Sequence, residues 1–264
     1  MIIDSHTHIG KFLGFDLEEE VLLEGLKKYG ISFALVSNLE GGEVDHQQKE
    51  IPILEQHSQI ETNKRLLKIV RKNQDKLGAL IWIRPRNEEC NVELEKLIGE
   101  NLDIIYGIKV HPYHSKFPFN DKKMFAYFKL AEKYNLPVVT HTAVDKDSHP
   151  RLVYEVAKLF PNVNFVMCHM GLATDNEEAI KLIAKLPNLY GDTTWVPLNK
   201  VKKAIKICGK EKILFGTDAP INGMDIYKNE YYKDYFNKKT NLSKEVLENL
   251  LYKNALKLFN IKID

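Results

Sequence analysis

The chain has few cysteines, no long apolar run and no excess of charge of either sign. Its 264 residues include three cysteines, Cys90, Cys168 and Cys208, which lie far apart. This odd, scattered set excludes a disulfide framework and a Cys-x-x-Cys zinc site, and it is typical of a reducing compartment. No apolar segment approaches the roughly 20 residues of a membrane span, and the N-terminus lacks the pattern of a signal peptide. We therefore expect a cytoplasmic protein with no membrane partner.

The charge balance also excludes classes of partner. The 38 basic and 36 acidic residues leave a net charge of +2, which gives no reason to expect a nucleic-acid partner. The lysine-rich stretch 200–212 places its lysines between apolar residues at helical spacing, so it is interpreted as a solvated helix face. The expected partner is a small-molecule substrate.

Short apolar segments alternate with amphipathic segments along the whole chain. The alternation predicts strands near 1–10, 31–37, 78–85, 105–112, 137–142, 163–169, 188–194 and 212–218. It predicts helices within 16–30, 60–76, 92–99, 121–134, 150–160, 174–186, 201–207 and 243–259. Asp16 with Glu19 and Thr174 with Glu177 resemble capping boxes, and Gly30 is a favourable residue for a helix C-terminus.

Eight strand-helix repeats favour one closed α/β barrel. Uniformly apolar strands between amphipathic helices indicate a parallel sheet covered by helices, and eight units of this length suit a (β/α)8 TIM barrel over residues 1–264. An open doubly wound sheet is the alternative, but residues 39–43 match neither glycine-rich phosphate-binding pattern. The polar stretch 39–63 is interpreted either as a lid over the catalytic face or as a surface insertion.

The opening segment carries two histidines at alternating positions. In Asp4-Ser5-His6-Thr7-His8, the side chains of His6 and His8 share one face of a strand and project together near its end. Two imidazoles placed in this way can bind one metal ion. A single His-x-His pair is more often part of the solvated surface. Whether His6 and His8 bind a metal therefore depends on which residues lie at the ends of the other strands.

Further imidazole and charged side chains follow at the ends of later predicted strands. They are Lys109, His111, His141, His169 and Asp218. All fall at carboxyl ends, where barrel enzymes place their active sites. Nitrogen and carboxylate ligands suit zinc, manganese, iron or nickel better than calcium or magnesium. We expect zinc, with three imidazoles, one carboxylate and an open position for a water whose pKa falls to about 7. Asp218 could accept the proton of that water.

Several segments of the chain, taken together, resemble those of a known family. The similarity covers essentially the whole chain and identifies it as a member of the amidohydrolase superfamily, in the amidohydrolase-2 group of enzymes similar to aminocarboxymuconate-semialdehyde decarboxylase. The segments that carry it are Asp4-Ser5-His6-Thr7-His8, Gly107-Ile108-Lys109-Val110-His111-Pro112, His141-Thr142, His169-Met170-Gly171, Phe215-Gly216-Thr217-Asp218-Ala219-Pro220 and Asn254-Ala255-Leu256-Lys257-Leu258-Phe259.

The resemblance implies roles for individual residues. It implies that His6, His8, His141 and Asp218 bind one catalytic divalent metal, and that His169 hydrogen-bonds the metal's water or polarises the substrate. In two-metal relatives a lysine on the fourth strand is carboxylated and bridges the ions, so a second metal is the alternative if Lys109 is carboxylated. The Gly-x-Lys-x-His-Pro context resembles the one-metal branch, in which Lys109 contacts substrate.

Other residues near strand ends have two interpretations each. His111 shares the strand face of Lys109 and either binds substrate or has a structural role at the rim. Arg84 either binds a substrate carboxylate or forms an internal ion pair. The tyrosine-rich stretch 227–236 either walls the pocket or packs between helices. His46, His57 and His149 are interpreted as having no role in the site.

Three functions remain open. The first is hydrolysis of an amide, lactam, ester or lactone, in which Asp218 moves the proton and His169 and Lys109 stabilise the oxyanion. The second is non-oxidative decarboxylation or hydration of an unsaturated or aromatic carboxylic acid at the same metal. The third is metal binding without catalysis. A homodimer is compatible with each of them.

Overall fold

A computed structural model describes residues 1–12, 14–45 and 47–262. In this part of the chain, nine strands form one curved sheet, ordered β2-β1-β3-β4-β5-β6-β7-β8-β9. The strands are β1 (Ile3–Phe12), β2 (Phe15–Leu17), β3 (Phe33–Asn38), β4 (Leu77–Trp82), β5 (Ile105–Val110), β6 (Val138–Ala143), β7 (Phe165–Leu172), β8 (Leu189–Asp192) and β9 (Ile213–Leu214). Strand β2 pairs antiparallel with β1, and the other neighbours are parallel.

The sheet closes on itself where β1 meets the segment that follows β9. Asp218 N donates to His6 O at 2.9 Å, and His8 N donates to Ala219 O at 2.8 Å. The predicted (β/α)8 barrel is therefore confirmed, with β2 as a short addition. The same seam brings the two histidines of β1 next to Asp218.

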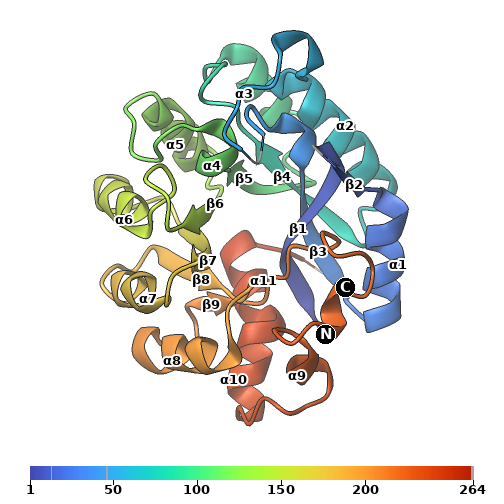
Figure 1. Cartoon of the computed structure of the whole chain (residues 1–264), viewed down its shortest axis with the longest axis vertical. Helices are drawn as coiled ribbons and strands as arrows, with labels where there is room; N and C mark the ends of the chain where they lie inside the picture. Colours follow the sequence, from blue (N-terminus) through green and yellow to red (C-terminus); the bar gives the residue numbers. More distant parts are fainter. Residues whose placement is uncertain (13, 46, 263–264) are drawn as a thin grey trace.

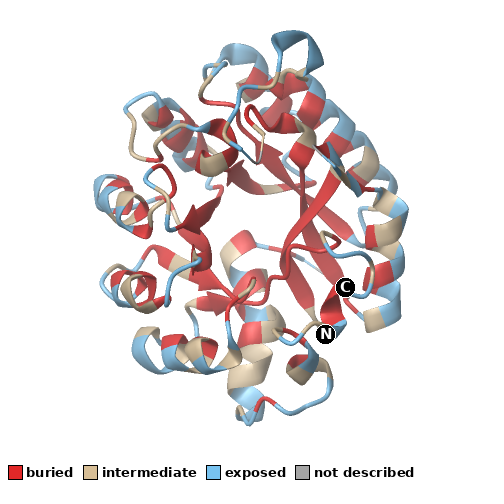
Figure 2. Ribbon diagram, in the orientation of Figure 1, coloured by how far each residue is buried: buried red, intermediate tan, exposed pale blue. Residues whose placement is uncertain are grey.

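Helices surround the ring of strands (Figure 1). They turn buried faces inward and exposed faces to solvent in the described residues (Figure 2). The helices are α1 (Glu19–Tyr29), α2 (Gln59–Lys72), α3 (Val92–Gly99), α4 (Pro112–Ser115), α5 (Met124–Lys133), α6 (Pro150–Leu159), α7 (Glu177–Ile183), α8 (Leu198–Cys208), α9 (Lys233–Phe236), α10 (Lys244–Glu248) and α11 (Asn254–Phe259). A π-helical turn (Asn249–Lys253) joins α10 to α11. None of the described helices is both long and apolar enough to span a membrane.

Two helix starts differ from the capping pattern of the sequence. Asp16 lies in β2 opposite Lys11, and α1 begins at Glu19 without a side-chain cap. Thr174 accepts a hydrogen bond from Asn176 N, and Asn176 rather than Thr174 precedes α7. In both places a tight connection precedes the helix. Asp16 belongs to the β1–β2 hairpin and Thr174 to the turn before α7, so neither residue caps the helix that follows. Gly30 ends α1 in the left-handed region, with φ of 66°, as predicted.

The polar stretch after β3 is attached to the rim of the barrel. It contains two 3-10 turns, Leu39–Gly41 and Ile53–Glu55, before α2 begins. The backbone amides of Glu43 and Val44 both donate to His114 O, at 2.8 and 2.9 Å. These bonds hold the stretch against α4, which follows β5, and so make it part of the upper rim.

The interior of the barrel is apolar near the N-terminal ends of the strands. Inward residues of several strands, among them Ile3, Phe33 and Leu80, pack with Phe259 and Ile261 from the end of the chain. This apolar layer closes the bottom of the barrel. Polar side chains are consequently gathered at the opposite, carboxyl ends of the strands.

Candidate metal centre and active site

The two histidines of β1 meet Asp218 at the seam of the barrel. His6 and His8 are two residues apart on one strand and are buried, with 1% and 2% of their surface exposed. His6 Nε2 lies 2.9 Å and His8 Nε2 3.2 Å from Asp218 Oδ1, and the two Nε2 atoms are 3.2 Å apart. These three ligand atoms, predicted from the sequence, therefore converge on one point.

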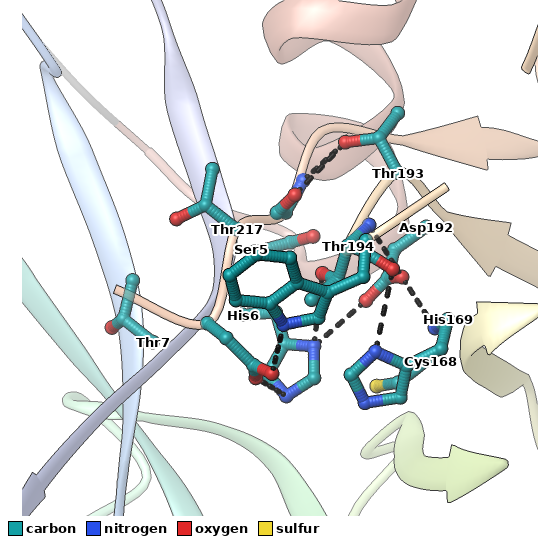
Figure 3. A network of polar contacts seen from close by, with 12 residues as sticks. Ser5, His6, Thr7, Cys168, His169, Asp192, Thr193, Thr194 and Thr217 are labelled. Atoms are coloured by element: carbon teal, nitrogen blue, oxygen red, sulfur yellow. Dashed lines mark hydrogen bonds and ion pairs between the residues drawn. The ribbon is translucent and has the colours of Figure 1, made fainter. Parts of the chain in front are cut away.

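Asp192 fixes the orientation of His6. Its Oδ2 lies 2.9 Å from His6 Nδ1, and its Oδ1 accepts hydrogen bonds from His169 N and Thr194 N at 2.8 and 3.1 Å (Figure 3). A carboxylate behind a histidine holds the hydrogen on Nδ1 and leaves Nε2 as a metal ligand. Asp192 ends β8 and belongs to the site as a positioning residue.

His8 is oriented by a weaker partner. Ser37 Oγ, near the end of β3, lies 2.9 Å from His8 Nδ1. A hydroxyl can donate or accept, so it holds the ring without adding a charge. The two neighbouring imidazoles therefore have different support from the second layer of residues.

The donor set fits a divalent transition metal. Two ligand atoms bound at about 2.0 to 2.1 Å in a tetrahedral zinc site lie roughly 3.3 Å apart. The observed separations among His6 Nε2, His8 Nε2 and Asp218 Oδ1 are 2.9 to 3.2 Å. Because Asp192 engages Nδ1 of His6, the neutral ring presents its lone pair to this centre. Imidazole nitrogen and carboxylate oxygen suit zinc and manganese alike.

Trp195 holds the second oxygen of Asp218. The indole Nε1 donates to Asp218 Oδ2 at 2.8 Å. The backbone of Trp195 is left-handed, with φ of 56°, and its amide donates to Tyr232 Oη at 2.8 Å. His169 and Asp218 also have positive φ, of 65° and 66°. Strained backbone of this kind gathers at functional sites, because the surroundings must hold it in place.

Three further histidines surround the centre. His111 and His141 stack with ring centroids 4.2 Å apart, and His141 lies 4.8 Å from His169. Among the described residues, two groups have ligand atoms within 4.8 Å of one another, and neither contains His141: they are His6, His8 and Asp218, and His6, Cys168 and Asp192. The role of His141 as a ligand therefore stays a prediction that its position beside the centre permits.

Hydrogen bonds define what two of these rings can offer. His111 Nδ1 accepts from His114 N at 3.3 Å, so the neutral ring carries its hydrogen on Nε2. His169 Nδ1 lies 3.3 Å from Thr194 O, which can only accept, so the neutral ring of His169 has Nε2 as an acceptor. His111 thus offers a donor to a ligand, and His169 offers an acceptor.

The pKa values of four histidines and of Asp218 suit metal binding near neutral pH, whereas the pKa of His6 is held well above its ordinary value. Burial opposes that rise, but the neighbouring Cys168, Asp218 and Asp192 favour the protonated ring, so a metal would have to displace a proton from His6. Burial lowers the pKa of His8 to about 3 and that of His169 to about 4. Burial and neighbouring imidazoles hold the pKa of His111 and of His141 well below the ordinary value. Burial raises the pKa of Asp218, but the surrounding imidazoles outweigh it and keep that pKa well below its usual range. Neutral imidazoles and an ionised carboxylate are the forms that bind a metal.

Lys109 lies beneath the histidines. Its side chain is fully buried, its Nζ is 2.6 Å from His6 Nε2, and Cys168 Sγ is 3.8 Å from Nζ. Lys109 is not among the described residues that line the cavity above the site. The structure therefore puts this lysine on the metal side, and its predicted contact with substrate stays untested.

A cavity of about 390 Å³ opens above the centre, within the size range of small-molecule sites. Its metal end is formed by His8, His111, His141, His169 and Asp218. Its other described lining residues are Phe12, Phe15, Leu39, Tyr113, His114, Ala143, Val144, Asp145, Leu172, Ala173, Trp195 and Ile221. Phe12 and Phe15 come from the β1–β2 hairpin, which the sequence did not indicate.

The remaining candidates lie elsewhere. Arg84 forms an ion pair with Glu88 at 2.8 Å, which agrees with the second of its two interpretations. From the stretch 227–236, Tyr232 supports Trp195 and donates to Thr217 O at 3.0 Å, so this stretch acts by packing behind the wall. His57 and His149 are not among the cavity-lining residues, and His46 lies outside the described residues.

Asp192, Ser37 and Trp195 could not be assigned from the sequence. Each acts by holding a ligand residue in place, and no spacing rule connects β8, β3 or the loop after β8 to the histidines of β1. The one available signal for Asp192 was its position at a strand end, which it shares with the ligands.

Solved structures share this fold at low sequence identity. One is 5-carboxyvanillate decarboxylase from Novosphingobium aromaticivorans, complexed with manganese (TM-score 0.74, 12% identity, covering 99% of this chain and 96% of that chain). Another is 2,6-dihydroxybenzoate decarboxylase from Rhizobium (TM-score 0.71, 14%, 98% and 98%). A third is a probable 2-pyrone-4,6-dicarboxylic acid hydrolase from Acinetobacter baumannii (TM-score 0.67, 14%, 98% and 99%). At these identities the likeness shows the fold alone.

Sequence comparisons give the family. A comparison with curated proteins finds no match. The family model Amidohydro_2, for amidohydrolases, matches residues 3–261, which is nearly the whole chain. This match includes every strand of the barrel and both histidines of β1. The chain belongs to the amidohydrolase family, in the group that its sequence resembled.

Proposed function

We propose that this protein is a metal-dependent hydrolase that cleaves an amide, lactam, ester or lactone bond of a small molecule. The observation that supports it most directly is the placement of Asp218. One carboxylate oxygen faces His6 and His8, and the other is held by the Trp195 indole at 2.8 Å. This fixes a proton acceptor beside the place where the donor set would hold a metal.

His6, His8 and Asp218 would hold the metal, with His141 as a further ligand. Zinc is the first ion to test, and manganese is the second because the structurally similar 5-carboxyvanillate decarboxylase binds it. When bound, such a metal supplies Lewis acidity and makes water more acidic, with a pKa of about 7.

Asp218 then acts as the proton carrier. Its pKa, held well below the usual range, keeps it ionised and able to accept a proton from water as the water attacks the carbonyl carbon. The carboxylate passes that proton to the leaving nitrogen or oxygen when the tetrahedral species collapses. The indole of Trp195 keeps the carboxylate from rotating away between the two steps.

The histidines at the metal end have complementary parts. His111, with its hydrogen on Nε2, donates to the carbonyl oxygen and stabilises the negative charge that develops there. His169, with Nε2 as an acceptor, orients water by accepting a hydrogen bond from it. Lys109 adds a positive charge beneath His6 if it is unmodified.

Non-oxidative decarboxylation is the second candidate. Two observations favour it: the aromatic lining of the cavity, with Phe12, Phe15, Tyr113 and Trp195, and the decarboxylases among the structures of similar fold. On this alternative the substrate is an aromatic acid whose carboxylate faces the metal end. Asp218 would then take up a proton from water and pass it to the ring carbon that loses CO2.

The test separates the two reactions on one preparation. Protein loaded with zinc or with manganese is offered aryl esters, dihydrocoumarin, anilides and hydroxybenzoic acids, and both hydrolysis and CO2 release are followed. We expect hydrolysis of at least one neutral substrate that stops with a chelator and returns with metal. Release of CO2 without any hydrolytic turnover would sink the hydrolase proposal and favour the second candidate.

A further inference from the structure

Among the described residues, the buried arginine and lysine side chains are Arg84 and Lys109, and both are committed elsewhere. Arg84 is 3% exposed and binds Glu88, Gln56 and the carbonyl of His57, which anchors the chain before α2. Lys109 is fully buried with its Nζ against His6. Neither residue is among the described residues that line the cavity.

The wall of the cavity away from the metal end carries no lysine or arginine in the described residues. It consists of aromatic and aliphatic side chains, chiefly Phe12, Phe15, Leu39, Leu172 and Ile221. The imidazole of His114 is used in the fold, with Nδ1 3.3 Å from Val44 O and the ring against Phe12 at 5.0 Å.

The one carboxylate on that wall, among the described lining residues, is at the rim. Asp145 accepts hydrogen bonds from the amides of Asp147 and Ser148, both at 3.0 Å, and so shapes the turn after β6. Its carboxylate is a like charge for a second anionic group that reaches the rim. An anion that lies instead against the apolar wall loses hydration, and no lysine or arginine among the described lining residues compensates for that loss.

We propose that the substrate is an apolar ring compound whose end away from the metal is uncharged. This inference rests on the proposed function for the reacting end and assigns the chemistry of the other end. Dicarboxylic acids are excluded as substrates, because one carboxylate could reach the metal but the second would face the apolar wall and Asp145. The cavity selects by hydrophobic contact and by the lack of lysine and arginine among its described lining residues, which disfavours an anionic competitor.

The test uses ligands anchored at the metal, so that only the far end differs. Benzohydroxamic acids chelate zinc through the hydroxamate, and the 4-methoxycarbonyl and 4-carboxylate forms differ at the para position by one charge. Calorimetry on zinc-loaded protein is expected to show the neutral ester binding tighter by a factor of roughly ten to a hundred. Equal affinity, tighter binding of the carboxylate, or no binding of the ester overturns the inference.

A charge placed on the rim gives a second, independent measurement. Val144 lines the cavity and is 61% exposed, so replacing it should leave the fold intact. Val144→Arg is expected to reduce the preference for the ester by roughly twofold to fivefold, because it supplies the missing cation. Val144→Gln, which has similar reach and no charge, should leave the preference unchanged. An equal change in both variants contradicts the inference.

Failure of the inference and failure of the proposed function give different results. If the ester binds tighter but no ester, lactone or amide is hydrolysed, the charge selection holds and the hydrolase proposal fails. If 4-acetoxybenzoate is hydrolysed with a kcat/KM equal to or above that of its methyl ester, the hydrolase proposal holds and the charge selection fails.

Discussion

The floor and the wall of the cavity are built in different ways. The floor is the metal end of the cavity, whose side chains lie at strand ends: His8, His111, His141, His169 and Asp218. Each ligand histidine of β1 has a second residue behind it, Asp192 for His6 and Ser37 for His8. The wall comes from the β1–β2 hairpin, the stretch after β3, α4 and the loops after β6 to β9. The floor is polar and closely hydrogen-bonded, whereas the wall is apolar, and several of its side chains, Phe12, Phe15, Leu39 and Ile221, belong to one packed cluster.

This difference corresponds to two roles, metal binding at the strand ends and substrate selection by the loops. A barrel strand fixes its end to within the tolerance that metal binding needs, since each strand is hydrogen-bonded to two neighbours. Loops can change without disturbing those strands, which is how one scaffold accommodates many substrates. Floor substitutions should therefore change metal affinity and kcat, and wall substitutions should change substrate preference and local stability.

Asp218→Asn should have the largest effect, on the floor. The amide cannot accept and return a proton, so kcat is expected to fall by roughly a hundredfold to ten-thousandfold, or about 3 to 5 kcal/mol in the barrier. Metal should remain bound through the histidines. Steady-state kinetics and elemental analysis check both points, with the exposed Asp16→Asn as the matched control. Full activity in Asp218→Asn, with metal retained, would identify another group as the proton carrier.

Glu43→Gln probes the wall through stability. Burial raises the pKa of Glu43 to about 7 from 4.5, although hydrogen bonds and Arg84 oppose the change. A raised acid pKa means that the folded protein binds this proton more tightly than the unfolded chain does. The resulting stability is complete below pH 4.5 and is lost as the pH rises to about 7. The loss amounts to about 3 kcal/mol.

Denaturant unfolding at several pH values measures this contribution. Glu43→Gln has no proton to lose, so its free energy of unfolding should fall less between pH 4.5 and pH 7 than that of the parent. Glu55→Gln, on the same stretch but exposed, is the control and should follow the parent. Parallel pH profiles for Glu43→Gln and the parent would show that this carboxyl does not titrate in that window.

Asp192→Asn and Ser37→Ala compare the supports of two neighbouring ligands. Loss of a carboxylate behind a metal-binding histidine costs roughly tenfold to a hundredfold in metal affinity. Asp192→Asn should show this loss in a competition titration with a chromogenic chelator. Ser37→Ala removes an uncharged partner of His8 and should cost less. A larger loss in Ser37→Ala would reverse the assigned importance of His6 and His8.

The sequence predicted the floor better than the wall for a physical reason. A strand end is a position that periodicity reveals, so the alternation of apolar segments was enough to place His6, His8, His141, His169 and Asp218 on one rim. The supports Asp192 and Ser37 depend on which strands are neighbours and on their register. The wall depends on loop conformations, which no periodic pattern encodes, so the hairpin that carries Phe12 and Phe15 was absent from the prediction and Asp16 was assigned to a helix cap.

The position of Lys109 shows a second limit of prediction from the sequence. Its strand and its inward face were predictable from alternation, but its height along the barrel axis relative to His6 was not. A side chain at the level of the apolar layer and one at the level of the cavity have the same sequence signature. The 2.6 Å approach of Nζ to His6 Nε2 is what places it beneath the centre.

Trp195→Phe is the smallest effect and tests the one residue that joins floor and wall. Phenylalanine keeps an aromatic side chain on the cavity but removes the N–H that holds Asp218 Oδ2. We expect kcat to fall by roughly fivefold to tenfold, about 1 kcal/mol, with little change in KM for an apolar substrate. The control is Tyr235→Phe, since the hydroxyl of the buried Tyr235 has no hydrogen-bond partner in the described residues and Tyr235 is not among those that line the cavity. That control should leave the ratio of kcat values near one. A larger change in KM than in kcat for Trp195→Phe would mean that the indole serves the wall alone, and that Asp218 keeps its orientation through the histidines of β1.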